Sequence, residues 1–177
     1  MEARPVEDER ELEQILDLQR ANLARNLSAE EIAGQGFVTV EHSLEVLRRM
    51  HQIAPSIVAK EGDLLAGYAL VMPVECRAFI PILEPMFERL GALGMLEKRF
   101  YVMGQVCVAK DWRGKGVFDL LYLAHRRHER PAYDLVVTEV ATRNRRSMRA
   151  HLRLGFTILE RYRGATDEWA LLQWDWK

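Results

Sequence analysis

The second half of the chain alternates strand-like and helix-like segments, and this alternation restricts the fold more than any other feature. Gly116–His128 carries apolar residues at i, i+3, i+4 and i+7, the spacing of an amphipathic helix. Arg145–Leu154 predicts a second helix, which Gly155 ends. The strands expected around these helices are Arg99–Ala109, Asp134–Thr142, Phe156–Tyr162 and Glu168–Trp176. Strands that alternate with crossover helices predict an α/β or α+β sheet, in which ligands bind where strands end and helices begin.

The first half has weaker patterns. Apolar spacing predicts amphipathic helices over Glu9–Ala24 and His42–Gln52. Asn26–Val40, which contains Gly34 and Gly36, is typical of a loop. The remaining expected elements are a short strand at Arg4–Val6, strands at Ser56–Lys60 and Leu64–Val71 around a tight turn, and a helix at Pro81–Leu90.

Composition excludes several classes of protein. The chain has 177 residues, of which 49% are hydrophobic and 29% charged, as in ordinary globular proteins. This length predicts one domain over residues 1–177. A net charge of -1 argues against a nucleic-acid partner, which would require a basic surface.

Neither a membrane nor a metal is indicated. Leu64–Val74, the longest segment without a charged residue, is too short to span a bilayer. The acidic start lacks the apolar segment of a signal peptide. Cys76 and Cys107 lie in apolar runs without metal-site spacing, so we expect buried, reduced thiols in a cytoplasmic protein.

A glycine turn, Asp111–Phe118, joins the Arg99–Ala109 strand to the following helix. Gly114 and Gly116 permit backbone conformations that other residues avoid, and the free N–H groups at a helix start bind anions, most often phosphate. The turn lacks the Ser or Thr of a Walker A loop and the third glycine of a dinucleotide fingerprint. By itself it is compatible with a nucleotide or phosphate-ester site, or with a simple turn before a helix.

Two motifs together resemble a known signature. Arg113-x-x-Gly116-x-Phe118 resembles the Gln/Arg-x-x-Gly-x-Gly/Ala loop that binds the acetyl-CoA pyrophosphate in GNAT (GCN5-related) N-acetyltransferases. The run from Asn144 through Ser147 and His151 to Gly155-Phe156 resembles the second half of that signature, Asn-x-x-Ala-x-x-x-Tyr-x-x-x-Gly-Phe. The segment at about 99–156 is thereby similar to the GNAT acyl-CoA core.

The resemblance implies a mixed central sheet, flanked by helices, with two splayed middle strands. Here these would be Tyr101–Ala109 and Asp134–Thr142, with the pantetheine arm of acetyl-CoA in the gap between them. The residues implied to bind the cofactor are Val106, Cys107 and Val108 along pantetheine, Arg113, Gly114, Lys115, Gly116, Val117 and Phe118 around the pyrophosphate, and Asn144 at the pantetheine amides. Asn144 is also a good N-cap for the helix that begins at Arg145. The five arginines within residues 143–153 could be a solvated helix face or contact the 3′-phosphate.

Two positions depart from the family pattern. Phe118 occupies the place of a Gly or Ala, and it either points into the core or narrows the site. His151 occupies the place of a Tyr that commonly protonates the leaving thiolate. Since an unperturbed histidine titrates near neutral pH, His151 is our candidate general acid, with packing on the helix face as the alternative.

The reaction implied by the resemblance is direct attack of a primary amine, from a small molecule or a peptide, on the thioester. The backbone N–H of Val108 would stabilise the oxyanion. Glu75 and Glu139 are the candidate bases, although either could face solvent. The alternatives are a non-catalytic acyl-CoA-binding module of the same fold and a nucleotide or phosphate-ester binder. The partial alternation of Glu168–Trp176 also allows that strand to be half exposed or to pair with a partner in a possible homodimer.

Overall fold

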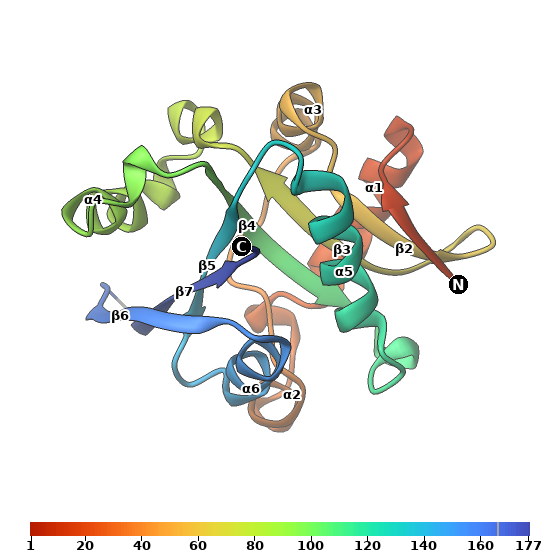
Figure 1. The fold of residues 1–177 in the computed structure, drawn as a ribbon. Coiled ribbons are helices and arrows are strands. Elements are labelled where there is room, and N and C mark those ends of the chain that lie inside the picture. Colours follow the sequence, from red (N-terminus) through yellow and green to blue (C-terminus); the bar gives the residue numbers. More distant parts are fainter. Residues whose placement is uncertain (166) are drawn as a thin grey trace.

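The central sheet of the computed structural model has seven strands in the order β1-β2-β3-β4-β5-β7-β6 (Figure 1). The structure describes residues 1–165 and 167–177. Neighbouring strands are antiparallel except β4 and β5, which are parallel. The strands are β1 Glu2–Pro5, β2 Ile57–Glu61, β3 Leu64–Met72, β4 Phe100–Val108, β5 Leu135–Ala141, β6 Thr157–Arg163 and β7 Glu168–Asp175. The predicted mixed sheet with crossover helices is confirmed.

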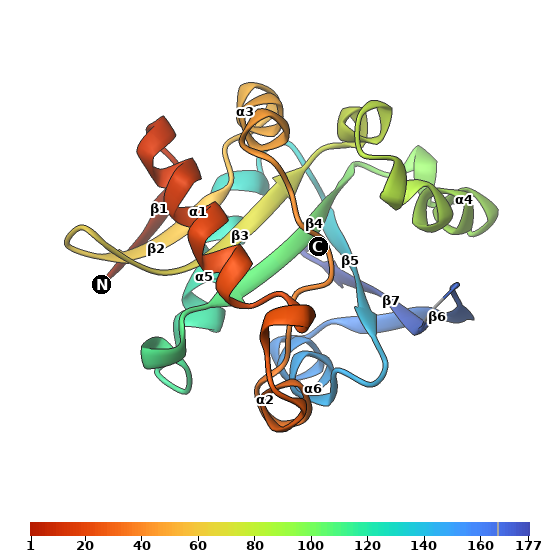
Figure 2. The same ribbon diagram turned by 180° about the vertical axis from the view of Figure 1, so that it is seen from behind.

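Helices cover both faces of this sheet. They are α1 Glu9–Ala21, α2 Ala29–Gln35, α3 Leu44–Ile53, α4 Glu84–Ala92, α5 Val117–Glu129 and α6 Arg145–Leu154, with short 3₁₀ turns between elements. One apolar cluster joins α1, α3 and α4 to one face, and a second joins α5 and α6 to the other. Accordingly, α5 lies in front of the sheet in Figure 1 and α1 lies in front of it in Figure 2. No helix in the described part of the chain is long and apolar enough to cross a membrane.

The segment Asn26–Val40, predicted to be a loop, contains α2, so that prediction was wrong. Ser28 and Glu31 form a capping box, in which each side chain accepts a hydrogen bond from the other residue's backbone N–H, at 3.2 Å and 3.1 Å. Gly34 lies near the helix end, and Gly36, with φ of 77°, stops it. The glycines therefore mark the end of a short helix that packs against α6.

The other differences are at element ends and at the sheet edge. Helix α3 begins at Leu44, because Ser43 accepts the N–H of Val46 and caps the helix there. Helix α4 begins at Glu84, after a 3₁₀ turn at Pro81–Leu83. The last strand, β7, is mostly buried between β5 and β6, so at this end of the sheet the edge strand is β6 and not the last strand.

Strands β4 and β5 separate part-way along their length. They pair only from Phe100 opposite Leu135 to Val102 opposite Val137, whereas β5 stays paired with β7 as far as Ala141. Beyond that point the hydroxyl of Thr138 donates a hydrogen bond to the carbonyl of Met103, 2.8 Å away. On the other side of β4, a register shift against β3 forms a bulge that turns the strand. The expected splay between the two middle strands is therefore confirmed.

Candidate functional site

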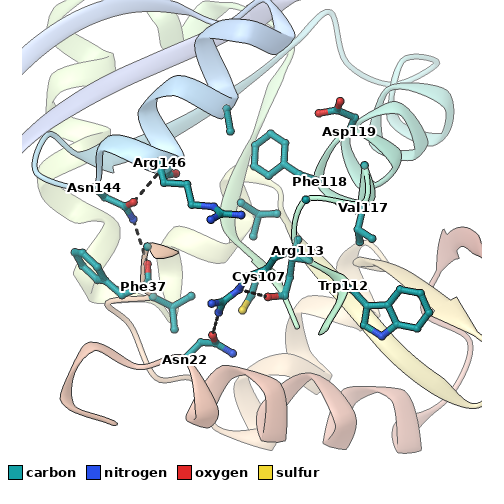
Figure 3. Close-up of a pocket in the computed structure, with 18 of the residues that line it drawn as sticks. Asn22, Phe37, Cys107, Trp112, Arg113, Val117, Phe118, Asp119, Asn144 and Arg146 are labelled. Atoms are coloured by element: carbon teal, nitrogen blue, oxygen red, sulfur yellow. Dashed lines mark hydrogen bonds between the residues drawn. The ribbon is translucent and has the colours of Figure 1, made fainter. Parts of the chain in front are cut away.

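A groove of about 380 Å³ lies where β4, the turn before α5 and the start of α6 meet (Figure 3). Nine of the residues predicted to bind the cofactor line it: Val106, Cys107, Val108, Arg113, Gly114, Gly116, Val117, Phe118 and Asn144. Lys115 is not among the lining residues, and its ammonium lies 5.1 Å from the ring centre of Trp112. The fold thus gathers two motifs that are separate in the sequence around one groove.

At alternate residues of β4, the backbone N–H and C=O groups point toward this groove. The N–H of Ala109 donates to the carbonyl of Ala66 on β3, 2.9 Å away. Since successive residues of a strand point their N–H and C=O groups to opposite sides, those of Val108 point away from β3. The carbonyl of Val108 accordingly accepts a hydrogen bond from Nε of Arg113, 3.2 Å away. Val108 therefore presents backbone polar groups to the groove.

The glycine turn supplies backbone donors to the groove. Gly114 and Gly116 have φ of 75° and 80°, a region that favours glycine. Gly116 is the N-cap of α5, and no side chain caps that helix. The first N–H groups of α5 lack partners within the helix, and together with the helix dipole they favour an anion.

Arginine side chains add positive charge to the groove. The guanidinium groups of Arg113 and Arg146 extend into it, and Arg113 also donates a hydrogen bond to the side chain of Asn22 at the end of α1 (Figure 3). Arg146 donates to Gln35 at 2.8 Å, and Arg153 is paired with Asp119 at 2.6 Å. Several arginines of α6 thus have partners within the chain.

Asn144 connects α6 to the segment that follows α2. Its Oδ1 accepts the N–H of Ser147 at 3.2 Å, which confirms the N-cap. Its Nδ2 donates to the carbonyl of Phe37, 3.3 Å away (Figure 3). Phe37, Val38 and Asn22 line the groove but were not found from the sequence, because only the folded chain brings them there.

A second cavity, of about 70 Å³, lies in the gap between β4 and β5. Its polar lining includes Gln105, Thr138, Glu139, Ser147 and His151. Glu139 is half-buried and accepts a hydrogen bond from the hydroxyl of Tyr162, and burial raises the pKa of its carboxyl group. Glu75, the other candidate base, is exposed and lines neither of these two cavities.

His151 has no solvent exposure and uses both ring nitrogens within the protein. Its Nδ1 lies 2.8 Å from the carbonyl of Ser147, so Nδ1 carries the hydrogen. Its Nε2 therefore accepts a hydrogen bond from the hydroxyl of Tyr122, 2.6 Å away. Burial lowers the pKa of this imidazole to about 4, so it is neutral at neutral pH.

Phe118 packs into an aromatic cluster. Its ring centre lies 4.9 Å from that of Tyr122 and 5.1 Å from that of His151. Of the two alternatives for this position, the structure supports a ring directed into the core, although its side chain also lines the groove.

Gln105 is a further polar residue that the sequence analysis missed. Its Oε1 accepts hydrogen bonds from Gln19 and from Tyr68, and its Nε2 donates to the carbonyl of Val40 at 2.8 Å. This buried network fixes the segment after α2 against α1 and β4. The signal in the sequence was a lone glutamine inside the apolar run Tyr101–Ala109.

Within residues 1–165 and 167–177, no group of three or more His, Cys, Asp or Glu residues could hold a metal ion.

Comparison with known proteins gave matches among solved structures. No protein-family model matches the chain, and no curated protein does. The solved structure of yncA from Salmonella typhimurium, described as an acetyltransferase with its cofactor acetyl-CoA, is similar over all of this chain and 94% of its own length, with a TM-score of 0.66 and 17% identity. An acetyltransferase described as of the GNAT family, from Desulfovibrio desulfuricans, is similar over 98% of this chain and 97% of its own, with a TM-score of 0.66 and 15% identity.

The ribosomal-protein-S18-alanine N-acetyltransferase of Escherichia coli is similar over 98% of this chain and 92% of its own length, with a TM-score of 0.65 and 12% identity. The chain has the GNAT acetyltransferase fold. At these identities the likeness establishes the fold alone, so the chemistry must be argued from the site. In this chain, the groove and the gap between β4 and β5 are the candidate site.

Proposed function

We propose that this protein transfers an acetyl group from acetyl-CoA to a primary amine. The observation that carries the proposal is a groove lined both by the outward-facing backbone of Val108 and by the uncapped start of α5. The backbone donors of the Arg113–Phe118 turn would bind the pyrophosphate. Val106–Val108 would bind the pantetheine arm, with Asn144 at its amides. The solved structure of yncA, which shares the fold and contains acetyl-CoA, supports acetyl-CoA as the cosubstrate.

The chemistry would take place where the groove meets the gap between β4 and β5, and there the amine would attack the thioester carbonyl. The Val108 N–H would stabilise the oxyanion, and one such donor is typically worth about 3–4 kcal/mol. The carboxylate of Glu139 would accept the proton of the amine, because it lines the cavity and its raised pKa makes it a better base. The leaving sulfur would face α6, where Ser147 and His151 line this gap.

The acceptor is a small-molecule or peptide amine. A lysine-like amine with a pKa near 10.4 is neutral only about once in 10³ molecules at pH 7.4, so it needs a base. An α-amine with a pKa near 8 is already roughly a fifth neutral and needs little help. The E. coli enzyme of the same fold is described as acting on a ribosomal-protein alanine. Both an α-amine and a lysine-like amine should therefore be among the first acceptors tested. Loss of Glu139 should slow transfer to the lysine-like amine more than transfer to the α-amine.

Two measurements together test the proposal. Acetyl-CoA at 100 times its Kd should stabilise the fold by about 2.7 kcal/mol, seen as a raised melting temperature. Turnover with a panel of amines, followed as free thiol, should then be detectable. Stabilisation without turnover would favour a non-catalytic acyl-CoA-binding module, and stabilisation by ATP but not by CoA would favour a nucleotide site.

A further inference from the structure

Ser147 lies where the groove meets the gap between β4 and β5. Five residues line both cavities: Phe37, Val38, Val106, Asn144 and Ser147. Of these, Asn144 and Ser147 have polar side chains. The amide of Asn144 already makes two hydrogen bonds, since its oxygen caps α6 and its nitrogen donates to Phe37, and its second N–H is the donor that the proposed function gives to pantetheine. Ser147 is the other polar side chain at this junction.

The neighbouring imidazole determines which way the Ser147 hydroxyl donates. Because Nδ1 of His151 carries its hydrogen toward the Ser147 carbonyl, the Ser147 Oγ, 3.3 Å from Nδ1, can only accept from it. The O–H of Ser147 has no hydrogen-bond acceptor among the residues that the structure describes. A half-buried hydroxyl beside two cavities, with its lone pair engaged and its proton free, is suited to donate into the site.

His151 itself is poorly placed to reach a ligand. Its ring has no solvent exposure, its Nε2 faces Tyr122, and its Nδ1 hydrogen faces the backbone of its own helix. Donation to a sulfur atom in the site would require breaking one of these contacts. Ser147, one turn earlier on the same face of α6, requires no such change.

We propose that the Ser147 hydroxyl donates a hydrogen bond to the thioester sulfur of acetyl-CoA, and that His151 is a positioning residue that orients this hydroxyl. This inference rests on the proposed function. The amine nitrogen bonds to the carbonyl carbon and gives a tetrahedral oxyanion; as the carbonyl re-forms, the C–S bond breaks and its electron pair goes to sulfur. The extra proton on nitrogen goes to the Glu139 carboxylate. CoA leaves as a thiolate held by Ser147 and takes its proton from water.

The test uses bound CoA and needs no acceptor amine. The thiol of CoA bound to the wild-type protein is titrated by its thiolate ultraviolet absorbance, and Ser147→Ala is compared with it. A hydrogen bond to an anion is worth enough to move a pKa by about one to two units, so the bound thiol of Ser147→Ala should titrate that much higher. Arg113 and Arg146 are present in both proteins, so the difference isolates the hydroxyl.

The outcomes separate the two hypotheses. If wild-type protein does not bind CoA in calorimetry, the proposed function fails, and this inference fails with it. If both proteins bind CoA and their bound thiols titrate alike, only the role of Ser147 is wrong. His151→Phe, checked for folding by its melting curve, should move the thiol pKa in the same direction by a smaller amount. A folded His151→Phe protein with a wild-type thiol pKa would remove His151 from the proposal.

Discussion

The hydroxyl of Tyr162, on β6, donates a hydrogen bond to Oε2 of Glu139, on β5. Glu139 also lines the cavity between β4 and β5, so its carboxylate is held at the place where we expect the acceptor amine. Burial raises the pKa of Glu139, and the hydrogen bond from Tyr162 partly opposes that rise. Burial, and after it the hydrogen bond to this carboxylate, raise the pKa of Tyr162, so this phenol stays protonated and remains a donor.

Glu139→Gln should lower kcat without changing the Kd for CoA. The amide keeps the shape and can still accept from Tyr162, but it cannot take a proton. General-base catalysis typically contributes roughly 10²–10⁴-fold, and we expect the loss to be larger for a lysine-like amine than for an α-amine. The measurement is thiol release at saturating acetyl-CoA with one amine of each kind.

Tyr162→Phe is the matched control for that variant. It keeps the carboxylate and removes only its donor, so the pKa of Glu139 should rise further and kcat at neutral pH should change by less than about tenfold. Full activity of Glu139→Gln with both amines would show that the base is elsewhere or is water.

Gly116→Asp should abolish stabilisation by CoA. The aspartate places a negative charge at the start of α5, where the pyrophosphate is expected to bind. The matched control is Gly62→Asp, since Gly62 also has a positive φ, of 58°, and open space around its Cα, but lies in the turn between β2 and β3. Both variants lose stability because each places an aspartate at a positive φ. Only Gly116→Asp should also lose the CoA-dependent rise in melting temperature. Equal rises in the two would mean that the turn has no part in binding.

Much of the sheet and of the groove could be predicted from the sequence because local patterns determine them. The spacing of apolar residues located α5, and Arg145–Leu154 was predicted with the bounds that α6 has. The family resemblance that rests on the two motifs implied nine residues that line one groove. Among them, the glycines at positive φ and the N-cap asparagine also have local physical causes.

The remaining features depend on contacts between distant segments. Asn22 is held at the groove by a hydrogen bond from Arg113, which follows it by 91 residues in the sequence. Phe37 is held there by a hydrogen bond from Asn144, which follows it by 107 residues. The burial of His151 depends on Tyr122, which belongs to a different helix. No periodicity in either segment encodes such a pairing. The resemblance implied that His151 is open to the site. In the structure His151 is buried, and the free hydroxyl belongs to Ser147, one helical turn earlier.

Substitutions of Asn144 separate its two roles. Asn144→Ala removes the N-cap of α6 and should lower the free energy of unfolding by about 0.5–2 kcal/mol. Asn144→Asp keeps a capping oxygen and should retain most of that stability, but it loses the Nδ2 donor. If the amide binds pantetheine, both variants should raise KM for acetyl-CoA. A wild-type KM for Asn144→Asp, whatever its stability, would limit Asn144 to the cap.

Three buried histidines should make the fold sensitive to mild acid. Burial lowers the pKa of His42 to about 4, of His125 to about 3 and of His151 to about 4, from an ordinary value of 6.5. Because the folded-state pKa is the lower one, the unfolded chain binds more protons between these values. Each histidine therefore contributes stability that is present above pH 6.5 and lost as the pH falls towards its folded-state pKa.

Two carboxyl groups act in the opposite direction over part of this range. Burial raises the pKa of Glu129 from 4.5 to about 7 and also raises that of Glu139, so their cost to folding is relieved as the pH falls. Three histidines still outnumber two carboxyl groups, so the net prediction is a loss of stability. Each net proton bound on unfolding changes the free energy of unfolding by about 1.4 kcal/mol per pH unit.

Urea denaturation at pH 7 and pH 5 should show a lower midpoint at about pH 5. His125→Phe, if it folds, should show a smaller difference between the two pH values, because one of the three histidines is gone. Equal midpoints for the wild-type protein at both pH values would contradict the prediction that unfolding binds net protons between pH 7 and pH 5.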